Sequence, residues 1–291
     1  MKELVYPLIN AIHNDDCFGR AAQLAYYFFF ALFPFLLFLT TLVGYISVPN
    51  LTDRIMELLV QILPGNASHL VEDNVHELVT VQRGGLLSFS IVAALWTSSS
   101  AIAAIISGLN RAYGVEEGRP FWKVRGLAIL LTIGFSLFLI ISMVLLTFGP
   151  WIGGWIATKV GLGSAFQIAW NLLRWPAILV LLMLAVAILY DFGPDVDQKW
   201  RWITPGSVIA VLAWIAASLG FAYYVNKFAS YNAAYGSIGT VIVLLTWMYL
   251  TGFFILVGGE INAVLEQRAQ KGKAPKPKRR WRAGRQRITT R

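Results

Sequence analysis

The stretch YNAAYGSIGTVIVLLTWMYLTGFFILVGGEINA, residues 231–263, decides the fold class. It holds one charged residue, Glu260, and the uncharged run before it reaches back to Lys227. A helix needs about 20 apolar residues to cross a bilayer. The stretch therefore predicts a membrane-spanning helix over 238–264 that carries a carboxylate.

The rest of the chain continues this pattern. Hydrophobic residues make up 57% of it and charged residues only 13%, whereas soluble domains keep roughly a quarter of their residues charged. Long windows almost free of charge predict five more spans, at 22–47, 87–109, 127–149, 175–192 and 205–225. We therefore predict an all-α polytopic membrane protein with six transmembrane helices, in a domain over 1–267 followed by a basic tail over 268–291.

Charge sets the expected orientation. Six spans place both termini on one side, and that side then holds 19 of the 24 Lys and Arg residues. The excess of Lys and Arg on cytoplasmic segments predicts cytoplasmic termini. Tryptophans cluster at the outer ends of the third and fourth spans, on the side away from the termini, and fit an interfacial aromatic belt: Trp151, Trp155, Trp170 and Trp175. In the fourth span we expect Pro176 in the first helical turn.

The outer loop, residues 50–86, reads as two amphipathic helices around Pro64 and Gly65. We expect them to lie on the membrane surface or to cover the outer mouth of the helix bundle. One stripe of the second helix carries two histidines and two carboxylates, which are metal-ligand types: His69, Glu72, Asp73 and His76. The wet face of an amphipathic helix is the preferred interpretation of this stripe.

Glu260 needs a partner, because a carboxylate at membrane depth costs a few kcal/mol unless it is paired, hydrated or protonated. We expect Arg111 or Arg20 to pair with it, in a cavity built by the first, second and sixth spans. Gly258 and Gly259 allow another helix to come close. A transport role and a simple helix-pinning role for the acid both stay open.

Other polar residues near the spans are candidates for a polar path: Gln23, Ser98, Ser99, Asn110, Asn262, Tyr231, Asn232 and Tyr235. The serines could instead bond back to their own helix, which is more common. YNAAYGSIG, residues 231–239, is rich in turn formers, so we expect a tight connection before the sixth span. We interpret DFGPDVD, residues 191–197, as a solvated turn.

The tail combines basic residues with a tryptophan, most densely at Lys276, Lys278, Arg279, Arg280, Trp281 and Arg282. It leaves the last span at the predicted cytoplasmic face. Anionic lipids of the inner leaflet are therefore its expected partner, and no specific nucleic acid is expected. The chain has no nucleotide-binding G-x-x-x-x-G-K-[ST] motif, and we expect no cofactor. The oligomeric state stays open.

Three stretches together resemble the YihY/BrkB family of bacterial inner-membrane proteins. They are AAQLAYYFFFALFPFLLFL at 21–39, LWTSSSAIAAIISGLNRAYGVEEGRPFWKVR at 95–125, and the closing stretch, where GGEIN stands in place of the family's usual GAEIN. The resemblance implies a six-helix inner-membrane protein without a settled catalytic site. Members have been labelled virulence factors or ribonuclease BN, and export of lipid-like molecules has been proposed for relatives.

Three functions are compatible with these patterns. A transporter or flippase-like protein for an amphipathic or anionic molecule fits the buried acid and the polar residues of the spans. A membrane scaffold with a partner-binding tail is the second. An enzyme such as a ribonuclease is the third, and we disfavour it because nucleases usually need clustered carboxylates or histidines, whereas Glu260 is the one acid expected at membrane depth.

Overall fold

A computed structural model describes residues 2–43, 84–161, 163–198, 202–227 and 229–269. In these ranges the chain is helical, which confirms the all-α prediction. The helices are α1 (Lys2–Asn14), α2 (Cys17–Val43), α5 (Gly84–Ala112), α6 (Phe121–Val160), α7 (Ser164–Phe192), α8 (Pro205–Lys227) and α9 (Ala229–Ala269). Six of them, α2 and α5 to α9, are long and apolar enough to cross a membrane, as predicted. The outer loop and the basic tail lie outside the described residues.

The chain divides into two compact units. The second unit, Tyr27–Ser98, contains the later part of α2 and the first part of α5. Within it, α2 continues through Pro34, and Thr97 Oγ1 donates to the Ala93 carbonyl at 2.8 Å. Thr97 therefore bonds to its own helix, as Ser and Thr in helices commonly do. The first unit, Met1–Tyr26 with Ser99–Arg291, carries the features described below.

The first unit begins with a helix that the sequence analysis did not predict. Helix α1 packs against α9 and ends before Asp15 and Asp16. Asp16 adopts a left-handed backbone conformation, with φ of 51°, and its Oδ1 accepts a hydrogen bond from Gly19 N at 3.2 Å. This bond caps the start of α2 by satisfying one of its free N–H groups. Charge-free windows miss α1 because it is short and amphipathic.

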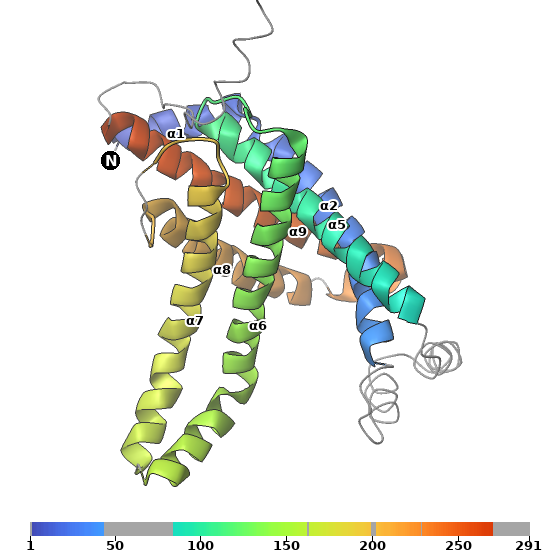
Figure 1. The fold of residues 1–291 in the computed structure, drawn as a ribbon, viewed down its shortest axis with the longest axis vertical. Helices are drawn as coiled ribbons and strands as arrows, with labels where there is room; N and C mark the ends of the chain where they lie inside the picture. The colour runs from blue at the N-terminus through green and yellow to red at the C-terminus, as the bar shows by residue number, and fades with distance from the viewer. Residues whose placement is uncertain (1, 44–83, 162, 199–201, 228, 270–291) are drawn as a thin grey trace, which may run out of the picture. The chain divides into compact units, whose positions relative to one another are not determined.

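Helices α6 and α7 form a long antiparallel hairpin (Figure 1). Both are longer than predicted, since α6 extends to Val160 and α7 starts at Ser164. Pro176 lies inside α7, so its predicted place in the first turn is wrong. A proline removes only one backbone donor, and a helix in a membrane can absorb that loss. At about 1.5 Å per residue, the 40 residues of α6 reach roughly 60 Å, about twice the hydrocarbon core.

Helix α9 corrects another prediction, because Ala229–Ala269 is helical throughout. The expected tight connection at 231–239 is therefore wrong. Small residues there do not break the helix, since alanine is the best helix former and membrane backbone needs internal hydrogen bonds. Further along, α8 and α9 meet at glycines. A side chain on Gly206 would overlap the Gly258 carbonyl, and one on Gly258 would overlap Tyr190 and Ala210. The close approach predicted at Gly258 is confirmed.

Candidate functional site

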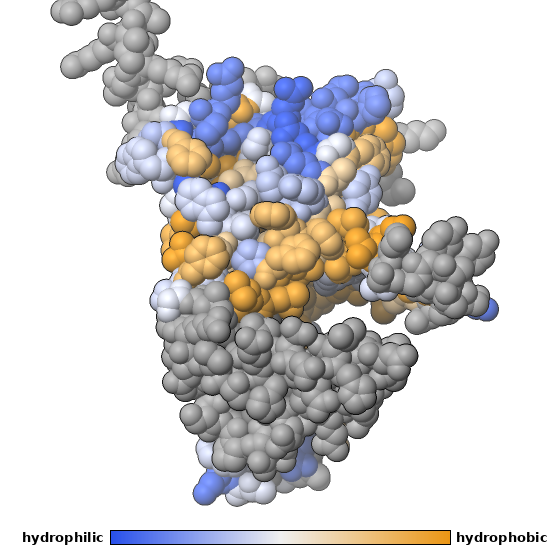
Figure 2. Space-filling model, turned by 90° about the vertical axis from the view of Figure 1, so that its right-hand side faces the viewer, coloured by the Kyte–Doolittle hydropathy of each residue, from blue (hydrophilic) through white to orange (hydrophobic). Residues whose placement is uncertain are grey.

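Polar groups of the first unit gather where α1, the loops after α5 and α7, and the last turns of α9 lie (Figure 1). We call this the charged end. In Figure 2, hydrophilic side chains gather at the same end. Four segments distant in sequence supply its side chains: the α1–α2 turn, the last turns of α5 with the loop that follows them, the loop after α7, and α9.

Glu260 lies on α9 just inside the charged end and is only 2% exposed. Its Oε1 accepts a hydrogen bond from Cys17 Sγ at 3.6 Å, which ties the start of α2 to α9. Its Oε2 is buried and has no hydrogen-bond partner among the described residues. Next to it, a side chain on Gly259 would overlap Leu109 of α5. The acid thus lies among α2, α5 and α9, the helices of the first, second and sixth spans, and no ion pair to it forms within the described residues.

The expected pairing of Glu260 with Arg111 is wrong. Arg111 Nε instead donates to Asp15 Oδ1 at 2.9 Å on the exposed side of α5. Arg20 Nε donates to the Asp15 carbonyl at 3.1 Å, and its Nη1 reaches Ser107 Oγ at 3.5 Å. The turn between α1 and α2 thus brings Asp15 to both arginines, and that turn was not predicted.

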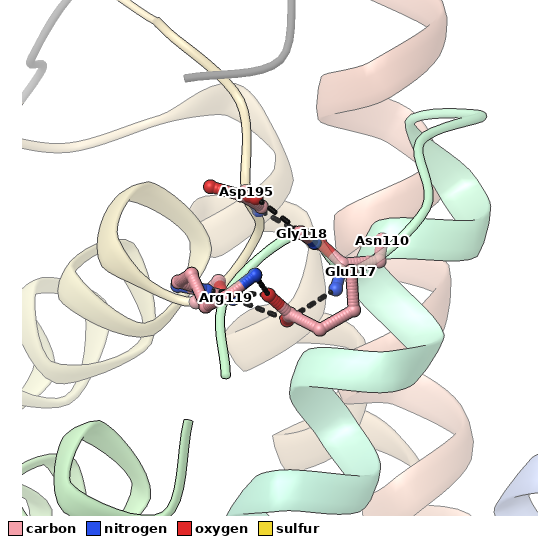
Figure 3. A network of polar contacts seen from close by, with 6 residues as sticks. Asn110, Glu117, Gly118, Arg119 and Asp195 are labelled. Carbon is pink, nitrogen blue, oxygen red and sulfur yellow. Dashed lines mark hydrogen bonds and ion pairs between the residues drawn. The ribbon is translucent and has the colours of Figure 1, made fainter. Parts of the chain in front are cut away.

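A second polar group forms around Asn110 in the last turns of α5 (Figure 3). Its Nδ2 donates to Glu117 Oε2 at 2.9 Å, and its Oδ1 accepts from Asp195 N at 2.7 Å. Asp195 Oδ2 accepts from Gly118 N at 3.2 Å. Asn110 therefore joins the loop after α5 to the loop after α7.

Arg119 completes this group. Its Nε and Nη2 donate to the two carboxylate oxygens of Glu117 at 2.7 Å each, and Nη2 also donates to the Gly193 carbonyl at 2.8 Å. Burial alone raises the pKa of the Glu117 carboxyl. The hydrogen bonds and charge of Arg119, with the Asn110 amide, outweigh it and hold that pKa below its ordinary value.

The loop after α7 is not the solvated turn that we expected. Asp195 is 1% exposed, and Gly193, Pro194 and Val196 are buried beside it. The reason is that Asp195 finds both a donor and an acceptor in the α5 region. Proline and two aspartates are typical of turns, so composition alone did not reveal the buried position.

Tyrosines and a glutamine extend the contact between these loops. Tyr113 Oη donates to Gln198 Oε1 at 3.1 Å, and Gln198 Nε2 donates to the carbonyls of Tyr190 and Asp191. Burial raises the pKa of Tyr113, so its hydroxyl stays a donor. The contacts of Tyr113, Gln198 and Cys17 were not predicted, because a single sequence carries no signal that pairs these residues with their partners.

Asn262 serves as a helix cap. Its Oδ1 accepts from Gly206 N at 2.8 Å and its Nδ2 donates to Thr204 Oγ1 at 2.9 Å. The first N–H groups of a helix lack partners within that helix, and Asn262 satisfies one at the start of α8. This bond fixes α8 to α9, so the structure gives Asn262 a packing role.

The remaining candidates do not converge on one path. Gln23 is exposed, Ser98 is partly buried, and Ser99 is fully buried. The backbone of Tyr231, Asn232 and Tyr235 belongs to α9, but their side chains lie outside the described part of the structure. The stripe His69, Glu72, Asp73 and His76 and the tail residues from Lys276 to Arg282 also lie outside it. In the described ranges, no three His, Cys, Asp or Glu side chains lie close enough to hold a metal ion.

An apolar groove lies beside the charged end, among α5, α6 and α7. Its volume is about 250 Å³. Every lining residue is apolar or glycine: Ile102, Leu127, Leu130, Leu131, Gly134, Phe135, Phe138, Ala185, Ile188, Leu189 and Phe192. Leu130 is 66% exposed and Phe192 is 47% exposed. The groove therefore opens onto the outer surface of the helices.

Six apolar spans and a polar end define a multi-pass integral membrane protein. The chain belongs to the family described as Virulence factor BrkB, which matches residues 8–282. The expected family is thereby confirmed.

Relatives agree with this assignment. YfkH of Bacillus subtilis (strain 168), whose name describes it as ribonuclease-like, is 42% identical over 86% of this chain and 90% of its own length. A UPF0761 membrane protein of Alteromonas mediterranea is 26% identical over 94% of this chain and 91% of its own. One from Alkalilimnicola ehrlichii is also 26% identical, over 89% of this chain but only 58% of its own length. No solved structure matches the chain.

Proposed function

We propose that this protein is a transporter or flippase-like protein that moves an amphipathic or anionic, lipid-like molecule across the membrane. The observation that carries the proposal is the apolar groove among α5, α6 and α7. Along α6, its lining runs from Leu127 to Phe138. At about 1.5 Å per residue this is roughly 16 Å, about half of a 30 Å hydrocarbon core. That length suits an acyl chain of one leaflet.

Basic residues beside the groove favour an anionic headgroup. Arg125 lies on α6 just before the first lining residue, and its Nη1 donates to Ser100 Oγ of α5 at 3.1 Å. Lys123 lies one half-turn earlier, over the ring of Trp122. A phosphate or carboxylate headgroup at this level would meet positive charge while its chain entered the groove. A purely structural scaffold needs neither feature.

Glu260 suits a coupling role in such a transporter. It is an enclosed carboxylate whose Oε2 finds no hydrogen bond within the described residues. Ionisable groups in membrane spans commonly mark proton or ion pathways. Taking up and releasing a proton there would change the charge between α2, α5 and α9. We therefore assign Glu260 to the driving step, and the lipid-like molecule to the groove.

We further propose that the protein acts without an enzymatic reaction. The acids Asp15, Glu117 and Asp195 at the charged end each accept hydrogen bonds that join segments of the fold. The ribonuclease-like description belongs to YfkH. The proposal also places the protein in a bacterial inner membrane with cytoplasmic termini, where the tail binds anionic lipids.

The groove is tested by filling it. A side chain on Gly134 would meet open space, so Gly134→Phe should fold and block the groove. Gly126→Phe on the same helix is the matched control, because Gly126 also faces open space and does not line the groove. The assay follows fluorescent NBD-phosphatidylglycerol in proteoliposomes, with dithionite bleaching the outer leaflet.

Wild-type protein and Gly126→Phe should both expose inner-leaflet probe to dithionite, and protein-free liposomes should not. Gly134→Phe should slow this movement several-fold, because the acyl chain of the lipid loses its groove. Equal rates for the two variants would contradict the groove as the path. Protected inner-leaflet probe with wild-type protein, as in protein-free liposomes, would contradict the proposed lipid transport.

A further inference from the structure

Arg174 of α7 is a half-buried cation in the hairpin of α6 and α7, far from the charged end. It lies across Gly149 of α6, where an added Cβ would come within 3.1 Å of Arg174 Cδ and 3.2 Å of Nη1. Its Nε and Nη1 are buried and find no hydrogen-bond acceptor among the described residues. Burying guanidinium donors without acceptors costs free energy. We therefore expect an acceptor that the described residues do not supply.

The surrounding residues hold the guanidinium in place. Trp170, one turn before Arg174, donates from Nε1 to the Gly149 carbonyl at 2.7 Å. Trp170 also fills the space above Gly153, where a side chain would overlap its ring. Arg174 Cζ lies 5.4 Å from the ring centre of Trp175. The arginine is thus positioned by α6 and by two tryptophans, which indicates a built site.

The hairpin supplies no nearby acid. Between Phe121 and Phe192 the sequence has one acidic residue, Asp191. It lies 17 positions after Arg174 on the same helix, about 25 Å along the axis. A salt bridge within the hairpin is therefore excluded. The other cation near the hairpin tip, Lys159, is exposed.

The depth of Arg174 indicates the kind of anion. Gly149, which Arg174 crosses, lies 24 residues after Arg125 on α6. At about 1.5 Å per residue this is roughly 36 Å, slightly more than a 30 Å hydrocarbon core. If Arg125 marks one interface, Arg174 lies at the headgroup level of the other. The exposed rings of Trp151, Trp155 and Trp175 lie in the same region, as interfacial tryptophans do.

We propose that Arg174, where it crosses Gly149, binds a phosphate group at the interface opposite the charged end, supplied by the headgroup of a phospholipid. Guanidinium presents a planar pair of donors that matches phosphate oxygens. The side edge of the guanidinium pairs Nε with Nη2 and its outer edge pairs Nη1 with Nη2, so each of the two buried nitrogens belongs to one such pair. This site is separate from the groove and does not depend on the transport proposal.

The test measures lipid binding to the purified full-length protein in neutral detergent by native mass spectrometry. Dihexanoylphosphatidylglycerol is the probe, and dihexanoylglycerol, which lacks phosphate, is the comparison. Arg174→Gln should weaken binding of the phospholipid about tenfold. Lys159→Gln removes a cation from the same hairpin and should leave binding unchanged. Arg174→Lys should give an intermediate loss, because an ammonium keeps the charge but lacks the planar donors.

Two results would overturn the proposal. One is equal binding of phosphatidylglycerol by the wild type and Arg174→Gln, and the other is equal binding of dihexanoylglycerol and the phospholipid. If Arg174→Gln does not fold, the comparison of Arg174→Lys with Lys159→Gln decides. Competition by inorganic phosphate at the same concentrations would support the phosphate site and assign it to soluble phosphate instead of a headgroup.

Discussion

Replacing Asn110 by Leu is expected to destabilise the protein by about 2–5 kcal/mol. The substitution keeps the size of the side chain and removes both of its hydrogen bonds. Asp195 N then loses its acceptor in a buried position. The Glu117 carboxylate loses the hydrogen bond from the Asn110 amide and keeps those from Arg119. The loop after α7 should release from α5. Thermal unfolding in detergent, followed by size-exclusion chromatography, measures the loss.

Asn171→Leu provides the matched control, since Asn171 is an exposed asparagine on α7. It should unfold at the wild-type temperature. Equal unfolding temperatures for Asn110→Leu and Asn171→Leu would show that the polar group of Figure 3 does not hold the two loops together.

Glu260→Gln is expected to stop lipid movement while the fold persists. The amide has nearly the same shape as the carboxylate and carries no charge, so the cost of enclosing an ion disappears. The unfolding temperature should stay the same or rise. Transport of NBD-phosphatidylglycerol should fall by about tenfold or more, because a protonatable group is lost from the driving step.

This variant separates the two roles that the sequence left open for the acid. If Glu260 only pins helices, Glu260→Gln will move lipid at the wild-type rate. Glu116→Gln is the control, since Glu116 is an exposed carboxylate at the charged end, and it should change neither quantity. A wild-type rate for Glu260→Gln would remove Glu260 from the mechanism and leave the groove proposal standing.

The hydropathy of the sequence was sufficient to predict the number and order of the membrane-spanning helices. Each predicted span corresponds to one of the six apolar helices, because a bilayer admits a long uncharged segment essentially as a helix. Helix ends were less predictable. Helix α6 continues past Pro150, and helix α7 starts well before Pro176. Helices can extend beyond the hydrocarbon core, where composition no longer limits them.

Partners within the candidate site were harder to predict than its members. Glu260, Asn110 and Asn262 were singled out from sequence as polar residues in apolar surroundings, and all three are buried. The partner of Arg111 was not found, because Asp15 reaches it through the turn after α1, a helix without a hydropathy signal. Cys17 meets Glu260 across 243 positions. Such contacts depend on packing between helices, which one sequence does not encode locally.

The most direct test of the proposed function is a structure of the protein in nanodiscs that contain phosphatidylglycerol. Lipid transport through the groove predicts chain-shaped density along α6 from Leu127 to Phe138, with a headgroup near Arg125. A groove closed by its own side chains, or one lined by water in place of lipid, would contradict this function.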